Sequence, residues 1–100
     1  MPNNKNILNI AKSVISIEKN AISQLESRLT KDFEDAVNLI YSSNGRVIVA
    51  GVGKSANIAN KMVATFNSTG QPAVFLHAAD AIHGDLGNIQ KEDVVICISK

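Results

Sequence analysis

The sequence has a single cysteine, and this scarcity excludes a class of protein. One cysteine cannot form the internal disulfide framework that stabilises many small secreted domains, so a reducing compartment is expected. Cys97 lies inside the apolar run 94–98. This position predicts a small buried core residue rather than a reactive thiol.

Charge of one sign and long apolar runs are also scarce. The formal net charge is +1, and no run of like charges suggests a nucleic-acid or membrane-surface partner. The N-terminal residues lack the apolar core and the cleavage site of a secretory signal, and no apolar run approaches membrane-spanning length. We therefore expect a cytoplasmic protein without a membrane-embedded part, in which any bound anion is held locally.

The N-terminal part of the chain has helical periodicity. Apolar residues recur every three or four positions from Ile7 to Leu29, which predicts a long amphipathic helix. Thr30 is expected to cap a second helix that carries acidic residues in its first turn and ends at residues 42–45. Residues 1–45 are thus interpreted as N-terminal helices that pack on the domain or at a subunit interface.

The remaining residues alternate between strand and helix patterns. Helical spacing is seen at 55–69 and, for about two turns, at 79–86. Three short apolar runs predict strands of a parallel sheet buried on both faces: 46–50, 73–76 and 94–98. This order predicts an α/β fold with a doubly wound, mainly parallel sheet, similar to the three-layer flavodoxin and Rossmann sandwiches. Because the chain stops directly after a strand, residues 46–100 are expected to be the first part of such a domain.

The loop after the first strand, 51–55, has the composition of an anion site. Gly51 and Gly53 allow positive φ and close approach by a ligand, Ser55 can cap the next helix, and Lys54 adds a charge. In open parallel sheets ligands bind beyond the carboxyl ends of the strands, where helices begin with free N–H groups. The loop is therefore either a phosphate or oxyanion site or a plain tight turn.

Two nucleotide-binding motifs compete for the same loop. A Walker A motif needs a glycine where this chain has Ile48, which argues strongly against a nucleoside triphosphatase. A dinucleotide fingerprint could be matched only as Gly51, Gly53 and Ala56, and His77 stands where an acidic residue should end the second strand. A site for a smaller phosphorylated ligand is the remaining alternative.

Residues 51–89 closely resemble the sugar isomerase (SIS) domain of bacterial D-arabinose 5-phosphate isomerases. The resemblance is carried by three segments in the family's order: the Gly-Val-Gly-Lys-Ser loop 51–55, the Ser-Thr-Gly turn 68–70 and the His-Gly-Asp-Leu-Gly segment 83–87. It implies interconversion of D-arabinose 5-phosphate and D-ribulose 5-phosphate for synthesis of the lipopolysaccharide sugar Kdo. The long helix 7–29 suggests a subunit interface, since members of the family are usually homotetramers.

The resemblance also implies roles for single residues. An aldose–ketose isomerase moves a proton through an enediolate, so it needs a base, an oxyanion stabiliser and a phosphate anchor. Lys54 is the candidate for the oxyanion or the phosphate, and His83 is the candidate for proton transfer or sugar binding. Five further positions are expected to contact substrate: Gly53, Ser55, Gly70, Gln71 and Ser99.

No cofactor is required by this chemistry. The resemblance implies that His77 can ligate zinc as an inhibitory or adventitious ion, and a structural histidine at the end of a strand is an equal alternative. Gly70 is also explained by a helix C-cap. A non-catalytic SIS module that binds sugar phosphates in a regulator is the alternative function.

Overall fold

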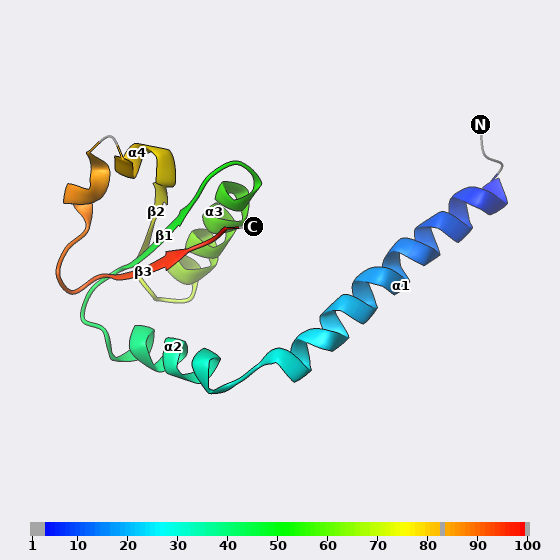
Figure 1. The fold of residues 1–100 in the computed structure, drawn as a ribbon, viewed down its shortest axis with the longest axis horizontal. Helices are drawn as coiled ribbons and strands as arrows, with labels where there is room; N and C mark the ends of the chain where they lie inside the picture. Colours follow the sequence, from blue (N-terminus) through cyan, green and yellow to red (C-terminus); the bar gives the residue numbers. More distant parts are fainter. Residues whose placement is uncertain (1–3, 83, 100) are drawn as a thin grey trace. The chain divides into compact units, whose positions relative to one another are not determined.

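The computed structural model describes residues 4–82 and 84–99. The chain divides into two compact units, Met1–Ala36 and Val37–Lys100. Figure 1 shows helix α1 in the first unit and the β-sheet in the second. Within the described residues, no helix is both long and apolar enough to cross a bilayer.

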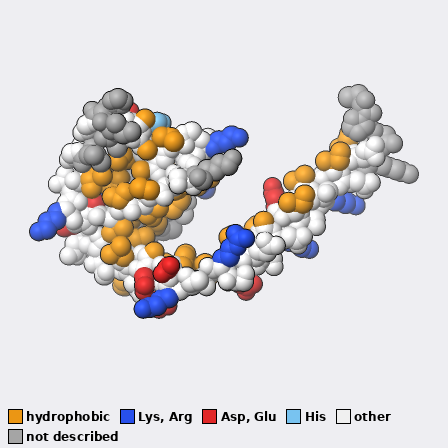
Figure 2. Space-filling model, viewed as in Figure 1, with side chains coloured by type: hydrophobic (Ala, Val, Ile, Leu, Met, Phe, Trp, Pro, Cys, Tyr) orange, Lys and Arg blue, Asp and Glu red, His pale blue; other side chains and the backbone are white. Residues whose placement is uncertain are grey.

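Helix α1 spans Asn4–Arg28, as its apolar periodicity predicts. Figure 2 shows hydrophobic side chains gathered along the helix, and Ile10, Val14 and Leu25 are about half exposed there. Nine large aliphatic side chains of α1 and the residue after it are exposed in all: Ile7, Leu8, Ile10, Val14, Ile15, Ile17, Ile22, Leu25 and Leu29. This unit therefore presents a long apolar stripe rather than a core of its own.

Helix α2 spans Lys31–Ser42 and begins as expected from its sequence. The Oγ1 atom of Thr30 accepts a hydrogen bond from the backbone N–H of Asp32 at 3.3 Å, which caps the first turn. Asp32 and Glu34 place negative charge at the positive end of the helix dipole. At the other end, Ile40 packs against the core of the sheet.

The sheet has three parallel strands: β1 at Val47–Gly51, β2 at Ala73–His77 and β3 at Val94–Cys97. Their order is β2-β1-β3, so β1 lies in the centre. All five residues of β1 are buried, because both of its edges are paired and both of its faces are covered. This arrangement confirms the predicted α/β fold with a parallel sheet.

The two crossover connections lie on opposite faces of the sheet. Helix α3, Lys54–Ser68, links β1 to β2 and packs its Ala59 against Val47 and Val49. Helix α4, Ala78–Ile82, and the 3₁₀ turn η1, Asp85–Asn88, link β2 to β3. Successive right-handed crossovers that move in opposite directions across a sheet must use opposite faces, which is the doubly wound topology.

Strand β3 departs from the prediction that all three strands are buried on both faces. Val95 is 42% exposed and Cys97 is exposed, so the expectation of a buried Cys97 is wrong. Residues alternate between faces along a strand, and Ile96 points to the face that packs with α3. Val95 and Cys97 point to the other face, where Asn88 and Ile89 line a pocket with residues of β1 and β2. Val74 of β2 is also 39% exposed.

An ion pair joins the amino ends of β1 and β3. The Nη2 atom of Arg46 lies 2.9 Å from Oδ2 of Asp93, and the backbone N–H of Arg46 donates to Oδ1 at 2.9 Å. Gln90 donates its N–H to Oδ2 at 2.7 Å, and the Asp93 side chain is only 2% exposed. The hydrogen bonds from Arg46, and then those from backbone N–H groups, hold the pKa of Asp93 well below its ordinary value of 3.8.

Replacing Asp93 by asparagine should lower the free energy of unfolding at pH 7. It should also weaken the loss of stability that the wild type shows as the pH falls. The wild-type carboxylate stabilises the fold above pH 3.8, and this contribution is lost as the pH falls toward the lower folded-state pKa. Urea unfolding at pH 7, 4 and 3 should therefore show a difference in the free energy of unfolding between wild type and Asp93→Asn, and this gap should narrow as the pH falls. Glu92→Gln, a change at the exposed neighbouring carboxylate, is the control, and a gap of constant size would contradict the prediction.

Candidate active site

The carboxyl ends of the three strands meet at one edge of the sheet. Gly51 pairs with His77 and Ala50 with Cys97 in the parallel register. The N–H of Ile98 donates to the carbonyl of Ala50 at 2.9 Å, so the pairing continues to the residue before Ser99. The strand order reverses at β1, and ligands of doubly wound folds bind at such a switch point.

Helix α3 begins at this edge without a side-chain cap. Gly53 is the N-cap residue with φ 56°, and no side chain accepts a hydrogen bond from the first turn. The structure therefore corrects the expectation that Ser55 caps the helix, because the N-cap lies two residues earlier, at Gly53, and Ser55 is the second residue of α3. Within the described residues, the backbone N–H groups of Lys54 and Ser55 have no acceptor. Free N–H groups at a helix N-terminus favour an anion.

Lys54 strengthens the positive potential of this helix end. It is the first residue of α3, its side chain is exposed, and it forms no ion pair within the part of the chain that the structure describes. A cation is disfavoured beside the positive end of a helix dipole. A lysine here therefore costs some stability unless an anion binds, and local rules of this kind are most often broken at functional sites.

Gly51 allows the first turn of α3 to pack directly on β1. A Cβ atom at this position would lie 2.9 Å from the carbonyl carbon and oxygen of Ser55 and 3.1 Å from the nitrogen of Ala56. Those contacts are with backbone, which cannot move aside as a side chain would. The close approach, rather than a positive φ, is the reason for glycine at this position.

His77 is the last residue of β2 and lies beside the loop that precedes α3. Its Nδ1 atom accepts a hydrogen bond from the N–H of Ala79 at 3.3 Å, and its ring meets that of Phe75 edge-on with centroids 6.2 Å apart. Within the described residues, no group of three His, Cys, Asp or Glu side chains could hold a metal ion. The role of His77 as a zinc ligand stays a prediction.

Gly70 and Gln71 lie at the opposite end of α3. Gly70 has φ 97°, and the N–H groups of Gly70 and Gln71 donate to the carbonyls of Asn67 and Phe66 at 3.4 and 2.9 Å. These bonds form a Schellman motif, which explains the glycine. Fifteen helical residues span about 22 Å, so within this chain the structure does not bring the two residues to Lys54. Their role in substrate binding stays a prediction.

The other predicted site residues are only partly placed. Ser99 is exposed and directly follows Ile98, whose backbone N–H donates to the carbonyl of Ala50. His83 lies outside the described residues. The structure thus groups Gly53, Lys54 and Ser55 with His77 and Ser99 at one edge of the sheet.

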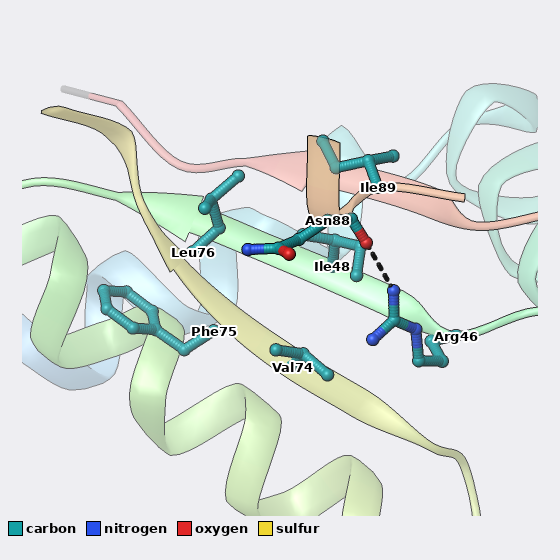
Figure 3. Close-up of a pocket in the computed structure, with 7 residues that line it drawn as sticks. All are labelled: Arg46, Ile48, Val74, Phe75, Leu76, Asn88 and Ile89. Carbon is teal, nitrogen blue, oxygen red and sulfur yellow. Dashed lines mark hydrogen bonds between the residues drawn. The ribbon is translucent and has the colours of Figure 1, made fainter. Parts of the chain in front are cut away.

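The pocket in Figure 3 lies against the sheet between Arg46 and Leu76, and none of the candidate site residues lines it. Its volume is about 50 Å³, well below the roughly 300 Å³ of a small ligand pocket. Arg46 is committed there, since its Nη2 also donates to the carbonyl of Asn88 at 2.7 Å. The pairing of Arg46 with Asp93 was not predicted from the sequence. The two residues are 47 positions apart, and an isolated charged residue does not indicate a distant partner. The pocket is lined by Arg46, Ile48, Val74, Phe75, Leu76, Asn88 and Ile89.

Comparison with known proteins identifies the fold family. The SIS domain model matches residues 39–100. The chain belongs to the SIS domain family. The match covers the three described strands and the residues grouped above at the carboxyl edge of the sheet.

The relatives of this SIS chain have consistent names. It is 49% identical over 94 residues to a Haemophilus influenzae protein named "Probable arabinose 5-phosphate isomerase", covering 94% of this chain and 28% of the relative. It is 41% identical over 99 residues to arabinose 5-phosphate isomerase KdsD of Pseudomonas aeruginosa, covering 99% of this chain and 30% of the relative. The resemblance to bacterial arabinose 5-phosphate isomerases is thereby confirmed.

A solved structure is also similar to this SIS chain. It is an Escherichia coli CFT073 protein in complex with arabinose 5-phosphate, with a TM-score of 0.92 and 39% identity over 99% of this chain and 53% of that chain. The chain thus spans less than a third of these curated relatives and about half of this structure.

Replacing Gly51 by alanine should destabilise this SIS domain without changing any charge. The new methyl group would overlap the backbone of Ser55, and overpacking of this kind lowers the free energy of unfolding by about 1–3 kcal/mol. The control is Gly87→Ala, because a Cβ at Gly87 meets nothing within 4 Å and should change stability by at most about 0.5 kcal/mol. Urea unfolding measures both, and equal stabilities would contradict the packing argument.

Proposed function

We propose that this chain forms part of the active site of a sugar-phosphate isomerase that interconverts D-arabinose 5-phosphate and D-ribulose 5-phosphate. The names of its relatives support this reaction. The product of such an enzyme would serve synthesis of the lipopolysaccharide sugar Kdo. The composition and charge of the chain suit a cytoplasmic protein with no nucleic-acid or membrane partner.

The observation that carries the proposal is the start of helix α3. It combines a glycine N-cap, unpaired N–H groups and an exposed lysine at the carboxyl edge of a parallel sheet. Each feature favours a compact anion, and together they match the needs of a sugar monophosphate. A plain tight turn would have no reason to place a cation at the positive end of the helix.

The chemistry suggests a role for each of the predicted site residues. Isomerisation moves a proton between C2 and C1, and negative charge develops on a sugar oxygen in the enediolate. Lys54 stabilises that oxygen or the phosphate, and a preorganised donor contributes about 3–4 kcal/mol to such a step. Gly53 and Ser55 offer backbone N–H groups and a hydroxyl, and Ser99 opens the phosphate loop. His83 transfers the proton, and no metal is needed because Lys54 supplies the positive charge.

Replacing Lys54 by alanine should lower kcat by about 10²–10³-fold in the full-length gene product. The melting temperature should stay unchanged or rise, because the change removes a cation from the positive end of α3. A coupled assay that follows D-ribulose 5-phosphate in the presence of EDTA measures turnover. The control is Lys61→Ala, which removes an exposed lysine from the middle of the same helix and should leave kcat within about twofold.

The same assay separates the competing functions. Undiminished turnover by the Lys54→Ala protein would remove that residue from the mechanism. A rise in melting temperature with D-arabinose 5-phosphate, without turnover by the wild type, would instead support a non-catalytic sugar-phosphate-binding module.

We also propose that the protein is a homotetramer that buries the apolar stripe of α1. Val14 lies near the centre of that stripe and is 47% exposed. Val14→Glu should shift the full-length protein to smaller species in light scattering, because a carboxylate cannot be buried unpaired. Ser16→Glu adds the same charge on the opposite side of the helix and should leave the mass unchanged. Equal masses for wild type and Val14→Glu would contradict this role of the stripe.

A further inference from the structure

His77 occupies a position from which it can reach the candidate site. The parallel register pairs it with Gly51, and paired strands lie about 4.8 Å apart. Gly51 is three residues before Lys54, so the imidazole flanks the anion-binding loop on the side of β2. The switch point lies on the other side of the loop, between β1 and β3. His77 is therefore placed beside the part of a ligand that extends away from that point.

The hydrogen bond from Ala79 favours a proton on the other ring nitrogen, Nε2. The N–H of Ala79 donates to Nδ1 of His77, and a nitrogen that accepts a hydrogen bond has no proton of its own. In a neutral imidazole the proton then lies on Nε2, which becomes a donor. Within the described residues no acceptor is found for this N–H, although the side chain is partly buried.

The orientation of the ring is restrained as well. The edge-on contact with Phe75, at an interplanar angle of 83°, limits rotation about the side-chain bonds. Together with the bond to Ala79, this contact presents Nε2 away from the backbone. A restrained donor loses little conformational entropy when it binds a ligand.

We propose that His77 is a substrate-binding residue whose Nε2–H donates a hydrogen bond to a hydroxyl oxygen of the sugar phosphate. This inference rests on the proposed isomerase function. It differs from the predicted role as a zinc ligand, because zinc at Nε2 of a neutral ring would require a proton on Nδ1 and so the loss of the bond to Ala79. It also differs from a purely structural role, in which Nδ1 only caps helix α4.

Two substitutions separate the roles of the two nitrogens. Asparagine at position 77 can place an acceptor near the position of Nδ1 but has no group at that of Nε2. Glutamine can place an N–H near the position of Nε2 but has no atom at that of Nδ1. His77→Asn should raise KM for D-arabinose 5-phosphate about 3- to 10-fold with kcat within about twofold, the effect of one lost hydrogen bond. His77→Gln should restore KM to within about twofold of the wild type.

Melting temperatures of the full-length proteins complete the test. If Nδ1 caps α4, the melting temperature of the His77→Asn protein should be near that of the wild type, and that of the His77→Gln protein should be lower. This difference should be the same with and without substrate. Equal KM values for the asparagine variant and the wild type would overturn the inference, as would a larger rise in KM for the glutamine variant. Histidine ¹⁵N shifts that show a proton on Nδ1 of His77, in the free protein or with zinc, would also overturn it. Absence of turnover by the wild type would overturn the proposed function and this inference with it.

Discussion

The ion pair between Arg46 and Asp93 sets the alignment on which the rest of the domain depends. The carboxylate of Asp93 accepts hydrogen bonds from both the side chain and the backbone N–H of Arg46. The N–H of Val94, the residue after Asp93, donates to the carbonyl of Arg46 at 2.9 Å. β3 is thereby held in one register against β1. A slip of one residue would turn Ile96 away from the core that it shares with α3, and it would move Ser99 relative to the loop before α3.

The two ends of the sheet use cations in opposite ways. At the amino end, Arg46 is 36% exposed and fully committed to Asp93 and to the carbonyl of Asn88. At the carboxyl end, Lys54 has no protein partner within the described residues and lies beside unpaired N–H groups. A paired charge stabilises the fold, whereas an unpaired charge at a helix N-terminus stabilises a bound anion. This asymmetry separates the structural end of the domain from the end proposed to bind sugar phosphates.

Much of the fold could be predicted from local patterns, and the errors occur where neighbours in space decide. The periodicity of α1, the cap at Thr30 and the turn at Gly70 each depend on residues within a few positions in the chain. The expected cap at Ser55 is wrong by two residues, because the chain enters α3 at Gly53 and the first turn of the helix then packs directly on Gly51. The expected burial of Cys97 is wrong because its side chain lies on an exposed face of β3, which pairs with β1 along one edge only in the described sheet. Neither the start of α3 nor the exposure of Cys97 is indicated by the residues next to it in the sequence.

The sequence by itself determined the parallel α/β fold, the family and the loop that holds Lys54, because apolar periodicity and motif spacing are properties of short segments. Only the tertiary structure decided which of the predicted residues lie together. It groups His77 and Ser99 with that loop and leaves Gly70 and Gln71 about a helix length away. The reason is physical: parallel strands bring their carboxyl ends to one edge whatever their separation in the chain, and a helix carries its last residues back to the other edge.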